Sequence, residues 1–250
     1  MPVRSRLRSL AKEWLLGRGV LISRPPGQFD VMHLKLSAAR ARGLEIGSAI
    51  DGGAADGSWA RLFHRVYPEA SILCVEPRES CATSLARVTA ELGNARHAAV
   101  CLGSRRGTVA VNVSGDQSSI LENSLGERFG TRATYEMTRL DDLVADTGFP
   151  RPDLIKLDLQ GAELEALAGA GACLEHAQVL VLEVSFLPFQ RGAPLLHDTL
   201  SFCEARGFRA YDIPGLWHRP LDGALAQADV MFVREGHPLI SDPRWSADFA

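Results

Sequence analysis

The segment IGSAIDGGAADG, residues 46–57, most constrains the fold, because it joins an apolar run to a glycine-rich turn. Asp51 ends the apolar run, and Gly53 and Gly57 follow in a D-x-G-x-x-x-G spacing. Glycines lack a Cβ and therefore let a backbone approach a ligand closely. Glu76 closes the next apolar run, SILCVEP, and an acidic residue at that place in doubly wound folds binds ribose hydroxyls. The pattern predicts a nucleoside-binding pocket at the ends of two parallel strands.

The same turn also bears on the choice of cofactor. A dinucleotide turn would read G-x-G-x-x-G and a P-loop G-x-x-x-x-G-K-[ST], and residues 51–57 have neither spacing. S-adenosylmethionine has no phosphate and carries a positive sulfonium, which suits a turn with Asp51 and Asp56. We therefore expect this cofactor. The alternative is an ordinary strand-to-helix turn in which Asp56 is the helix N-cap.

The pattern downstream predicts an α/β domain. A helix over residues 29–43 follows Pro25-Pro26-Gly27, and strands then alternate with helices as in a parallel sheet. We predict strands at 46–51, 71–75, 96–100, 153–158, 179–184, 207–212 and 227–233, helices at 57–66, 79–91, 162–169 and 195–206, an antiparallel pair at 107–113 and 133–138, and a loop or lid at 114–131. The expected organisation is an N-terminal helical cap (1–45), a catalytic domain (46–236) and a C-terminal tail (237–250).

Composition excludes several classes of protein. The 250 residues are 46% hydrophobic, so the chain can bury a full core, and its five cysteines form no C-x-x-C pair. We expect reduced thiols in a cytoplasmic protein. A net charge of −3 gives no global basis for binding nucleic acid, and no apolar run approaches eighteen residues, so we expect no transmembrane segment.

Positive charge is concentrated at the N-terminus. Residues 1–45 hold nine Lys and Arg against three acidic residues. A basic helix there, with Leu7, Leu10, Trp14 and Leu15, is interpreted as a cap on the catalytic domain, and peripheral contact with an anionic membrane is the alternative. The apolar stretch is too short for a signal peptide.

A second informative segment is PDLIKLDLQGAELEALAGAG, residues 152–171. Its apolar strand carries Lys156 and ends at Asp158, and Gly161 opens a helix with Glu163 in its first turn. Charges at the carboxyl end of a central strand are costly to bury, and that edge is where open α/β sheets bind ligands. The alternative, capping and helix-dipole roles for the acids, leaves Lys156 without a function.

Together, DGGAADG, CVEP, TRLDDLV and DLIKLDLQGAELEALAGA resemble the FkbM-type S-adenosylmethionine-dependent methyltransferases over about residues 46–234. The resemblance implies a Rossmann-like class I fold: a mostly parallel seven-stranded sheet with an antiparallel C-terminal strand. It also implies O-methylation of a hydroxyl on a sugar, glycolipid or polyketide-type small molecule. The chain departs from the usual pattern at Ala55-Asp56 and at Gln160, where glutamate is common. The expected cofactor-binding residues are Asp51, Gly52, Gly53, Ala54, Gly57, Ser58, Glu76, Pro77, Arg78, Ala99, Ser118, Ser119 and Asp158.

Methyl transfer to a hydroxyl requires a base or a metal, since such a hydroxyl is weakly acidic. We place Asp158 first, with Lys156 as its charge partner two residues back on the same strand face. The other catalytic candidates are Glu163, Glu183 and His218. A divalent ion such as Mg²⁺ held by Asp158, Glu163 and Glu183 is the alternative.

The acceptor pocket is expected in the loops after the fifth and sixth strands, where aromatic faces lie near polar side chains suited to sugar rings. Its candidate residues are Phe186, Phe189, Arg191, His197, Trp217 and His218. The expected partner is thus a small molecule or glycan, and assembly into a homo-oligomer is left open. N- or C-methylation of a related molecule and, more remotely, NAD-dependent oxidation are the alternatives; the latter lacks both a pyrophosphate turn and a Y-x-x-x-K pair.

Overall fold

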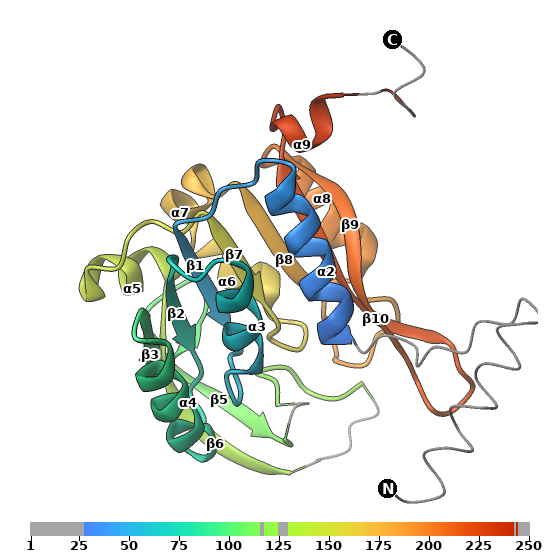
Figure 1. Cartoon of the computed structure of the whole chain (residues 1–250). Coiled ribbons are helices and arrows are strands. Elements are labelled where there is room, and N and C mark those ends of the chain that lie inside the picture. The colour runs from blue at the N-terminus through green and yellow to red at the C-terminus, as the bar shows by residue number, and fades with distance from the viewer. Residues whose placement is uncertain (1–27, 116–117, 125–129, 243, 245–250) are drawn as a thin grey trace, which may run out of the picture.

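The computed structural model describes residues 28–115, 118–124, 130–242 and 244. Within these residues, seven strands form one sheet in the order β3-β2-β1-β7-β8-β10-β9 (Figure 1). The strands are β1 (Ser48–Gly52), β2 (Ser71–Val75), β3 (Ala95–Ala98), β7 (Leu154–Leu157), β8 (Val179–Ser185), β9 (Phe208–His218) and β10 (Leu225–Arg234). Neighbours from β3 to β8 pair in parallel, and β10 is antiparallel to both β8 and β9. The predicted α/β sheet with one antiparallel C-terminal strand is confirmed.

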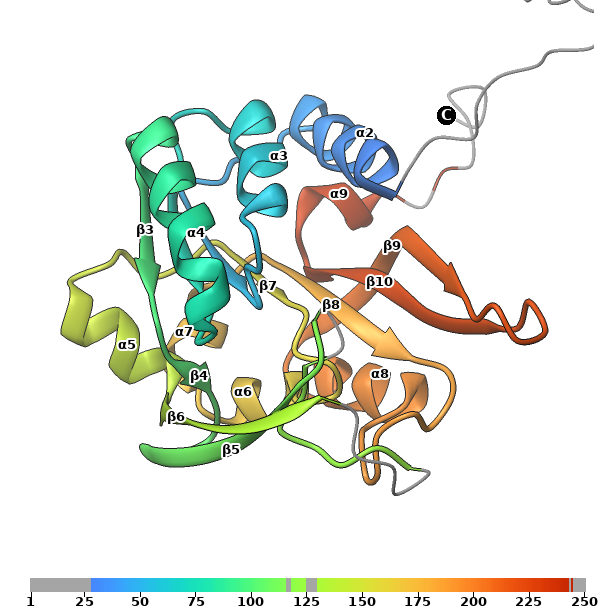
Figure 2. The same cartoon turned by 90° about the horizontal axis from the view of Figure 1, so that it is seen from below.

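Helices cover both faces of this sheet, as Figure 2 shows. On one side lie α2 (Gln28–Ala41), α3 (Ser58–Val66), α4 (Glu79–Leu92) and α9 (Pro238–Ser241); on the other lie α5 (Leu140–Thr147), α6 (Glu163–Ala168), α7 (Gly171–His176) and α8 (Leu196–Glu204). Neither α5 nor α7 was predicted from the sequence. Both are short, with too few turns for a distinct apolar period.

A small second sheet lies beside α6, in the order β4-β6-β5 (Figure 2). It comprises β4 (Cys101–Leu102), β5 (Gly107–Val113) and β6 (Thr131–Thr138), of which β5 and β6 are the predicted antiparallel pair. The predicted strand at 96–100 is wrong in extent. The chain leaves the main sheet after Ala98, and β4 pairs with β6 instead.

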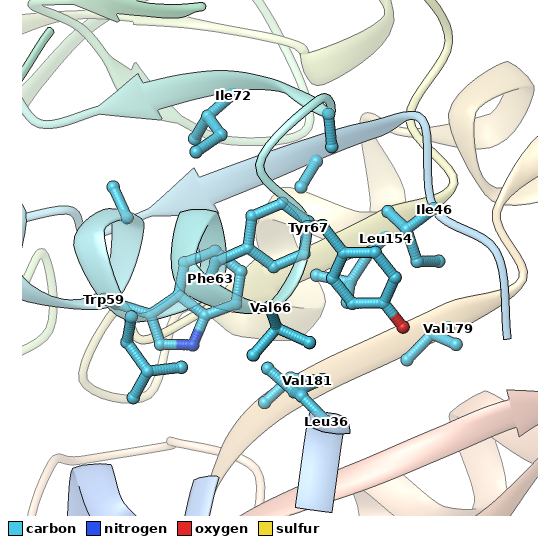
Figure 3. Packing of buried hydrophobic residues seen from close by; sticks show 14 of the residues in the cluster. Leu36, Ile46, Trp59, Phe63, Val66, Tyr67, Ile72, Leu154, Val179 and Val181 are labelled. Atoms are coloured by element: carbon cyan, nitrogen blue, oxygen red, sulfur yellow. The ribbon is translucent and has the colours of Figure 1, made fainter. Parts of the chain in front are cut away.

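The core on the α3 side is built around three aromatic residues spaced four apart on one helix face. Trp59 stacks on Phe63 with ring centroids 5.1 Å apart, and Phe63 stacks on Tyr67 at 5.2 Å (Figure 3). Leu36 of α2 and Val181 of β8 belong to the same buried cluster. This packing fixes α3, and hence the glycine-rich turn that precedes it, against the sheet.

The cap helix α2 is part of this core, since Met32, Leu36 and Ala39 are buried in it. Leu239 of α9 is buried in the same cluster, and its carbonyl accepts a 2.8 Å hydrogen bond from Arg42 Nη2. The start of the expected tail therefore packs on the end of the expected cap. The basic segment with Leu7 to Leu15 lies outside the described residues. Among the residues that are described, no helix is long and apolar enough to cross a membrane.

Candidate functional site

A cavity of about 550 Å³ opens at the carboxyl ends of β1, β2, β7 and β8, a volume typical of small-molecule sites. Twelve residues that the sequence predicts as site residues line it: Gly53, Ala54, Ser58, Glu76, Pro77, Arg78, Ser118, Ser119, Lys156, Asp158, Glu183 and Trp217. They come from both halves of the sheet and from the segment after β5. The topology thus brings the nucleoside motif and the second motif to one place.

The glycine-rich turn between β1 and α3 needs glycine at two positions. Gly53 has φ +73°, and a Cβ there would lie 2.0 Å from the carbonyl oxygen of Asp158. Gly57 has φ +80°, and a Cβ would come within 2.7 Å of Val88 on α4. Any other side chain would therefore push the turn away from β7 or α3 away from α4. Gly57 does not line the cavity; it allows the turn that does.

Lys156 ties this turn to β7. Its Nζ lies 3.0 Å from Oδ1 of Asp51, which is its register partner on β1 and is fully buried. The same ammonium donates to the carbonyls of Gly52 and Gly53, at 3.4 and 3.3 Å. Burial alone would lower the pKa of Lys156, but the charges of Asp51 and Asp158 outweigh it and raise the pKa. The predicted partner, Asp158, is farther away at 4.0 Å, so Asp51 is the main partner.

Glu76 lies in the cavity wall just after β2 and is held by nitrogen donors on both oxygens. Oε1 accepts from the backbone N–H of Arg78 at 3.0 Å and from its Nε at 2.8 Å. Oε2 accepts from Arg78 Nη2 at 3.0 Å and from the Ala55 N–H at 3.1 Å. Burial opposes ionisation, but the hydrogen bonds and charge of Arg78 hold the pKa of Glu76 below its ordinary value. Glu76 is therefore a carboxylate.

Beyond β7, carboxylates and amides alternate along the cavity floor. Gln160 Nε2 donates to Asp158 Oδ1 at 3.1 Å and to Glu183 Oε2 at 2.7 Å. Gln227 Nε2 donates to the same Glu183 oxygen at 2.8 Å. Burial, followed by the charges of Asp158 and other acids, raises the pKa of Glu183 well above its ordinary value. The two amides thus orient a carboxyl group that holds its proton more tightly than an ordinary glutamate does.

Asp229 and Gln227 are lining residues that the sequence analysis missed. Both lie on the antiparallel strand β10, and Asp229 is the register partner of Glu183. Burial, then the charge of Asp158, raises the pKa of Asp229 to about 7. The signal in the sequence was an acidic residue inside the apolar run ALAQADVMFV, which resembles the Glu183 signal that was recognised.

The possible Mg²⁺ site at Asp158, Glu163 and Glu183 is not assembled. Glu163 Oε1 instead accepts hydrogen bonds from the N–H groups of Leu159, at 2.7 Å, and Gly161, at 3.3 Å. Across the described part of the chain, no three His, Cys, Asp or Glu side chains are grouped to hold a metal ion. Glu163 closes the loop before α6 and does not line the cavity.

The other predicted residues lie apart from the cavity lining. Ala99 is exposed between β3 and β4, and its neighbours Val100 and Cys101 line the cavity in its place. His218 is exposed on β9, and His197 is exposed with Nε2 3.2 Å from Asp198.

The segment after β8 is hydrogen-bonded to residues 122 and 124, which lie in the predicted loop, and not to the cavity lining. The Phe189 carbonyl accepts from the Ser124 N–H at 2.8 Å, and the Arg191 N–H donates to the Glu122 carbonyl at 2.7 Å. The Phe186 side chain packs partly on the core. Of the six predicted acceptor residues, Trp217 alone is in the cavity lining.

Comparison with known proteins agrees with this geometry. The FkbM methyltransferase domain model matches residues 51–210. The chain is 30% identical over 151 residues to the 2-O-methyltransferase NoeI of Sinorhizobium fredii, covering 54% of this chain and 62% of NoeI. It is also 30% identical over 152 residues to the methyltransferase sdnD of Sordaria araneosa, covering 48% of this chain and 59% of sdnD. The chain thus spans about three fifths of the length of these relatives.

A solved structure shares the fold. The FkbM methyltransferase of Methylobacillus flagellatus superposes with a TM-score of 0.50 and 20% identity, covering 78% of this chain and 47% of that one. The fold is therefore the Rossmann-like class I fold that the motifs predicted. The family match covers well over half of the chain and includes both the glycine-rich turn and the Lys156–Asp158 strand. The chain belongs to the FkbM methyltransferase domain family.

Proposed function

We propose that the enzyme methylates a hydroxyl oxygen of a small molecule such as a sugar, a glycolipid or a polyketide. The observation that carries this proposal is the composition of one cavity. At β1 and β2 it presents a glycine turn and the Glu76 carboxylate, and at β7, β8 and β10 it presents Asp158, Glu183 and Asp229. The first set suits a nucleoside, and the second suits a substrate that donates hydrogen bonds.

The residues present fit S-adenosylmethionine. Gly53 leaves room for close approach to the backbone, and Glu76 is a carboxylate at the place where two ribose hydroxyls would bind. The cavity wall also contains two buried polar atoms without a hydrogen-bond partner in the structure, Trp59 Nε1 and Gln160 Oε1. Such atoms are costly to leave unpaired, which supports a polar occupant.

When bound, S-adenosylmethionine supplies a methyl group on a positive sulfur. Asp158, Glu183 and Asp229 would hold the acceptor oxygen in line and take its proton as the new C–O bond forms. Asp158 remains our first candidate for the base, because it lies between the turn that holds the cofactor and the acids on β8 and β10. Lys156 Nζ lies 4.0 Å from Asp158 Oδ2, so a positive charge is adjacent to this carboxyl group.

The relatives support oxygen as the methylated atom, because NoeI is named a 2-O-methyltransferase. This chain spans only 62% of NoeI, so we do not infer that the two proteins share an acceptor. N-methylation of an amine is the second candidate, because the same acids would also bind a protonated amine.

Mass spectrometry tests the proposal directly. The full chain is incubated with S-adenosylmethionine and a panel of hydroxylated and aminated acceptors, and products are scored for the gain of one methyl group. An O-methyl product, located by fragmentation, is the expected result. Methylation of amines alone, or tight NAD binding without S-adenosylhomocysteine binding, would overturn it.

A further inference from the structure

The strand pair β9–β10 forms a wall of the cavity from which the proposed function uses Asp229 alone. Gly215 and Trp217 on β9 face the register partners Asp229 and Gln227 on β10. Because side chains two apart on a strand share a face, these four positions lie on one face of the sheet. Asp229 is in turn the partner of Glu183 on β8, so the row continues into the acidic floor.

Gly215 lets an aromatic ring and a carboxylate meet. A Cβ at Gly215 would lie 2.7 Å from Cη2 of Trp217 and 2.8 Å from Oδ2 of Asp229. The indole edge and the carboxylate therefore border the same small space above Gly215. Both residues line the cavity. A larger residue at 215 would separate them, so the glycine is a condition of this arrangement.

This combination has a chemical preference. An aromatic face packs on the apolar C–H face of a saturated ring, and an adjacent carboxylate accepts hydrogen bonds from hydroxyls at the edge of that ring. A flat apolar acceptor would use the indole and leave Asp229 desolvated without a partner, which is unfavourable. The wall therefore favours a polyhydroxylated ring over an apolar polyketide or lipid surface.

The charged residues that line the cavity further restrict the class of acceptor that it can bind. The charged residues lining the cavity, within the described residues, are the acids Asp56, Glu76, Asp158, Glu183 and Asp229 and the cations Arg78 and Lys156. Each of the two cations is paired with an acid, Arg78 with Glu76 and Lys156 with Asp51. An anionic acceptor beside Trp217 and Asp229 would meet the acids Asp158, Glu183 and Asp229, whereas Arg78 lies at Glu76 after β2; the partly buried setting increases the cost of this like-charge contact.

We propose that Trp217 and Asp229, together with Glu183, form an acceptor subsite for an uncharged polyhydroxylated ring of the pyranose type. This inference rests on the proposed function and narrows its acceptor class. Trp217 supports one face of the ring, Asp229 accepts hydrogen bonds from two of its hydroxyls, and Glu183 faces the hydroxyl nearest the cofactor. Sugar acids and sugar phosphates are excluded.

Binding to the S-adenosylhomocysteine complex of the full chain tests the subsite without requiring turnover. Saturation-transfer NMR is run with a panel of neutral methyl pyranosides and the matching methyl uronosides, which differ in carrying a carboxylate at carbon 6. Neutral rings should bind, and the uronosides should bind at least tenfold more weakly. No binding of any neutral pyranoside, or equal binding of the uronosides, would overturn the proposal.

Single substitutions test which residues form the proposed acceptor subsite. Trp217→Leu and Asp229→Asn should each raise the pyranoside dissociation constant at least tenfold and leave that of S-adenosylhomocysteine within threefold. Gly215→Ala should also raise the pyranoside dissociation constant at least tenfold, because the added methyl group would separate the Trp217 indole from the Asp229 carboxylate. The control is Leu216→Ala, because Leu216 adjoins Trp217 but is 53% exposed and does not line the cavity. Pyranoside binding unchanged in both Trp217→Leu and Asp229→Asn would place the acceptor elsewhere.

The outcomes for subsite and function can be told apart. Pyranoside binding that depends on Trp217 and Asp229, without methyl transfer to any hydroxyl, supports the subsite and contradicts the proposed function. Methyl transfer to a polyketide hydroxyl, with no pyranoside bound, supports the function and contradicts the subsite.

Discussion

The Arg78 guanidinium lies edge-on against the Glu76 carboxylate, with Nε 2.8 Å from Oε1 and Nη2 3.0 Å from Oε2. With the N–H groups of Arg78 and Ala55 added, four donors bind this carboxylate, which has about four lone-pair sites. Ribose hydroxyls that bind Glu76 must therefore replace the guanidinium. We therefore expect the Arg78 guanidinium to leave Glu76 when the proposed cofactor binds.

Glu76→Ala should weaken binding of S-adenosylhomocysteine by roughly tenfold to a hundredfold, because two hydrogen bonds to a charged group are lost and each 1.4 kcal/mol is a factor of ten. Calorimetry measures this. Glu79→Ala is the control, since Glu79 is exposed at the start of α4 and does not line the cavity. An unchanged dissociation constant for Glu76→Ala would show that the ribose is held elsewhere.

Arg78→Met should tighten binding of S-adenosylhomocysteine by about threefold to tenfold. Methionine keeps an apolar side chain of similar length but does not compete for Glu76, so the ribose need not displace an ion pair. The expectation from the sequence, that Arg78 itself binds the cofactor, predicts weaker binding in this variant. Weaker binding in Arg78→Met, again measured by calorimetry, would favour that alternative.

The fold could be predicted because its signals are local. Each buried strand is an apolar run, and β2 was predicted with its observed ends, Ser71 to Val75. The D-x-G-x-x-x-G spacing of the turn is also a local signal, although the contacts that require Gly53 and Gly57 are with Asp158 and Val88, which are distant in sequence. By contrast, the departure of the chain from the main sheet after Ala98 depends on pairing with β6, some thirty residues away, which no local pattern records.

The acceptor side was harder to predict because it is assembled across strands. Asp229 reaches the cavity because β10 runs antiparallel beside β8 and places it opposite Glu183. The composition of the loop after β8 suggested an acceptor pocket. The backbone of Phe189 and Arg191 is instead hydrogen-bonded to residues 124 and 122 of the predicted loop at 114–131. Composition alone does not show which face of a loop meets a cavity. The assignment of individual site residues stays a prediction until binding is measured.

Lys156→Met should lower the free energy of unfolding by about 3–5 kcal/mol, because it leaves the fully buried Asp51 carboxylate without its partner. Chemical denaturation measures this. Lys35→Met provides the matched control, since Lys35 forms a partly exposed ion pair with Asp212 at 2.9 Å and ion pairs near the surface contribute at most about 1 kcal/mol. Equal losses in the two variants would contradict the structural role of Lys156.

Glu163→Gln should become more stable relative to wild type as pH rises from 5 to 8. Burial, with the nearby Asp158 charge, raises the pKa of Glu163 to about 7 against the lowering effect of its backbone hydrogen bonds. Between the ordinary value of 4.5 and about 7, the unfolded chain releases this proton while the folded chain retains it. Wild-type stability therefore falls with rising pH in this window, and glutamine cannot titrate.

Between pH 5 and 8, the difference in unfolding free energy between Glu163→Gln and wild type should change by on the order of 2 kcal/mol. Chemical denaturation at each pH measures this difference. Asp229 titrates in both proteins, so its contribution cancels in the difference, whereas Glu183 contributes through its coupling to the Glu163 charge, which raises the pKa of Glu183. Glu165→Gln, at an exposed position of the same helix, should show a difference that varies by only a few tenths of a kcal/mol. A pH-independent difference for Glu163→Gln would mean that Glu163 is ionised in the folded protein.

Asp158→Asn should leave S-adenosylhomocysteine affinity within a few-fold and reduce turnover by on the order of a hundredfold or more, the usual contribution of a positioned base. Asparagine keeps the size of the side chain and an oxygen that can accept from Gln160 Nε2, so the arrangement of Gln160 and Glu183 should persist. Initial rates of methyl transfer, with EDTA and with added Mg²⁺ as separate arms, measure the effect. Because Glu163 is turned toward the backbone and no three-acid site is formed in the described residues, neither addition should change the wild-type rate. A fully active Asp158→Asn enzyme would instead assign proton removal to Glu183 or Asp229, the two acids paired across β8 and β10.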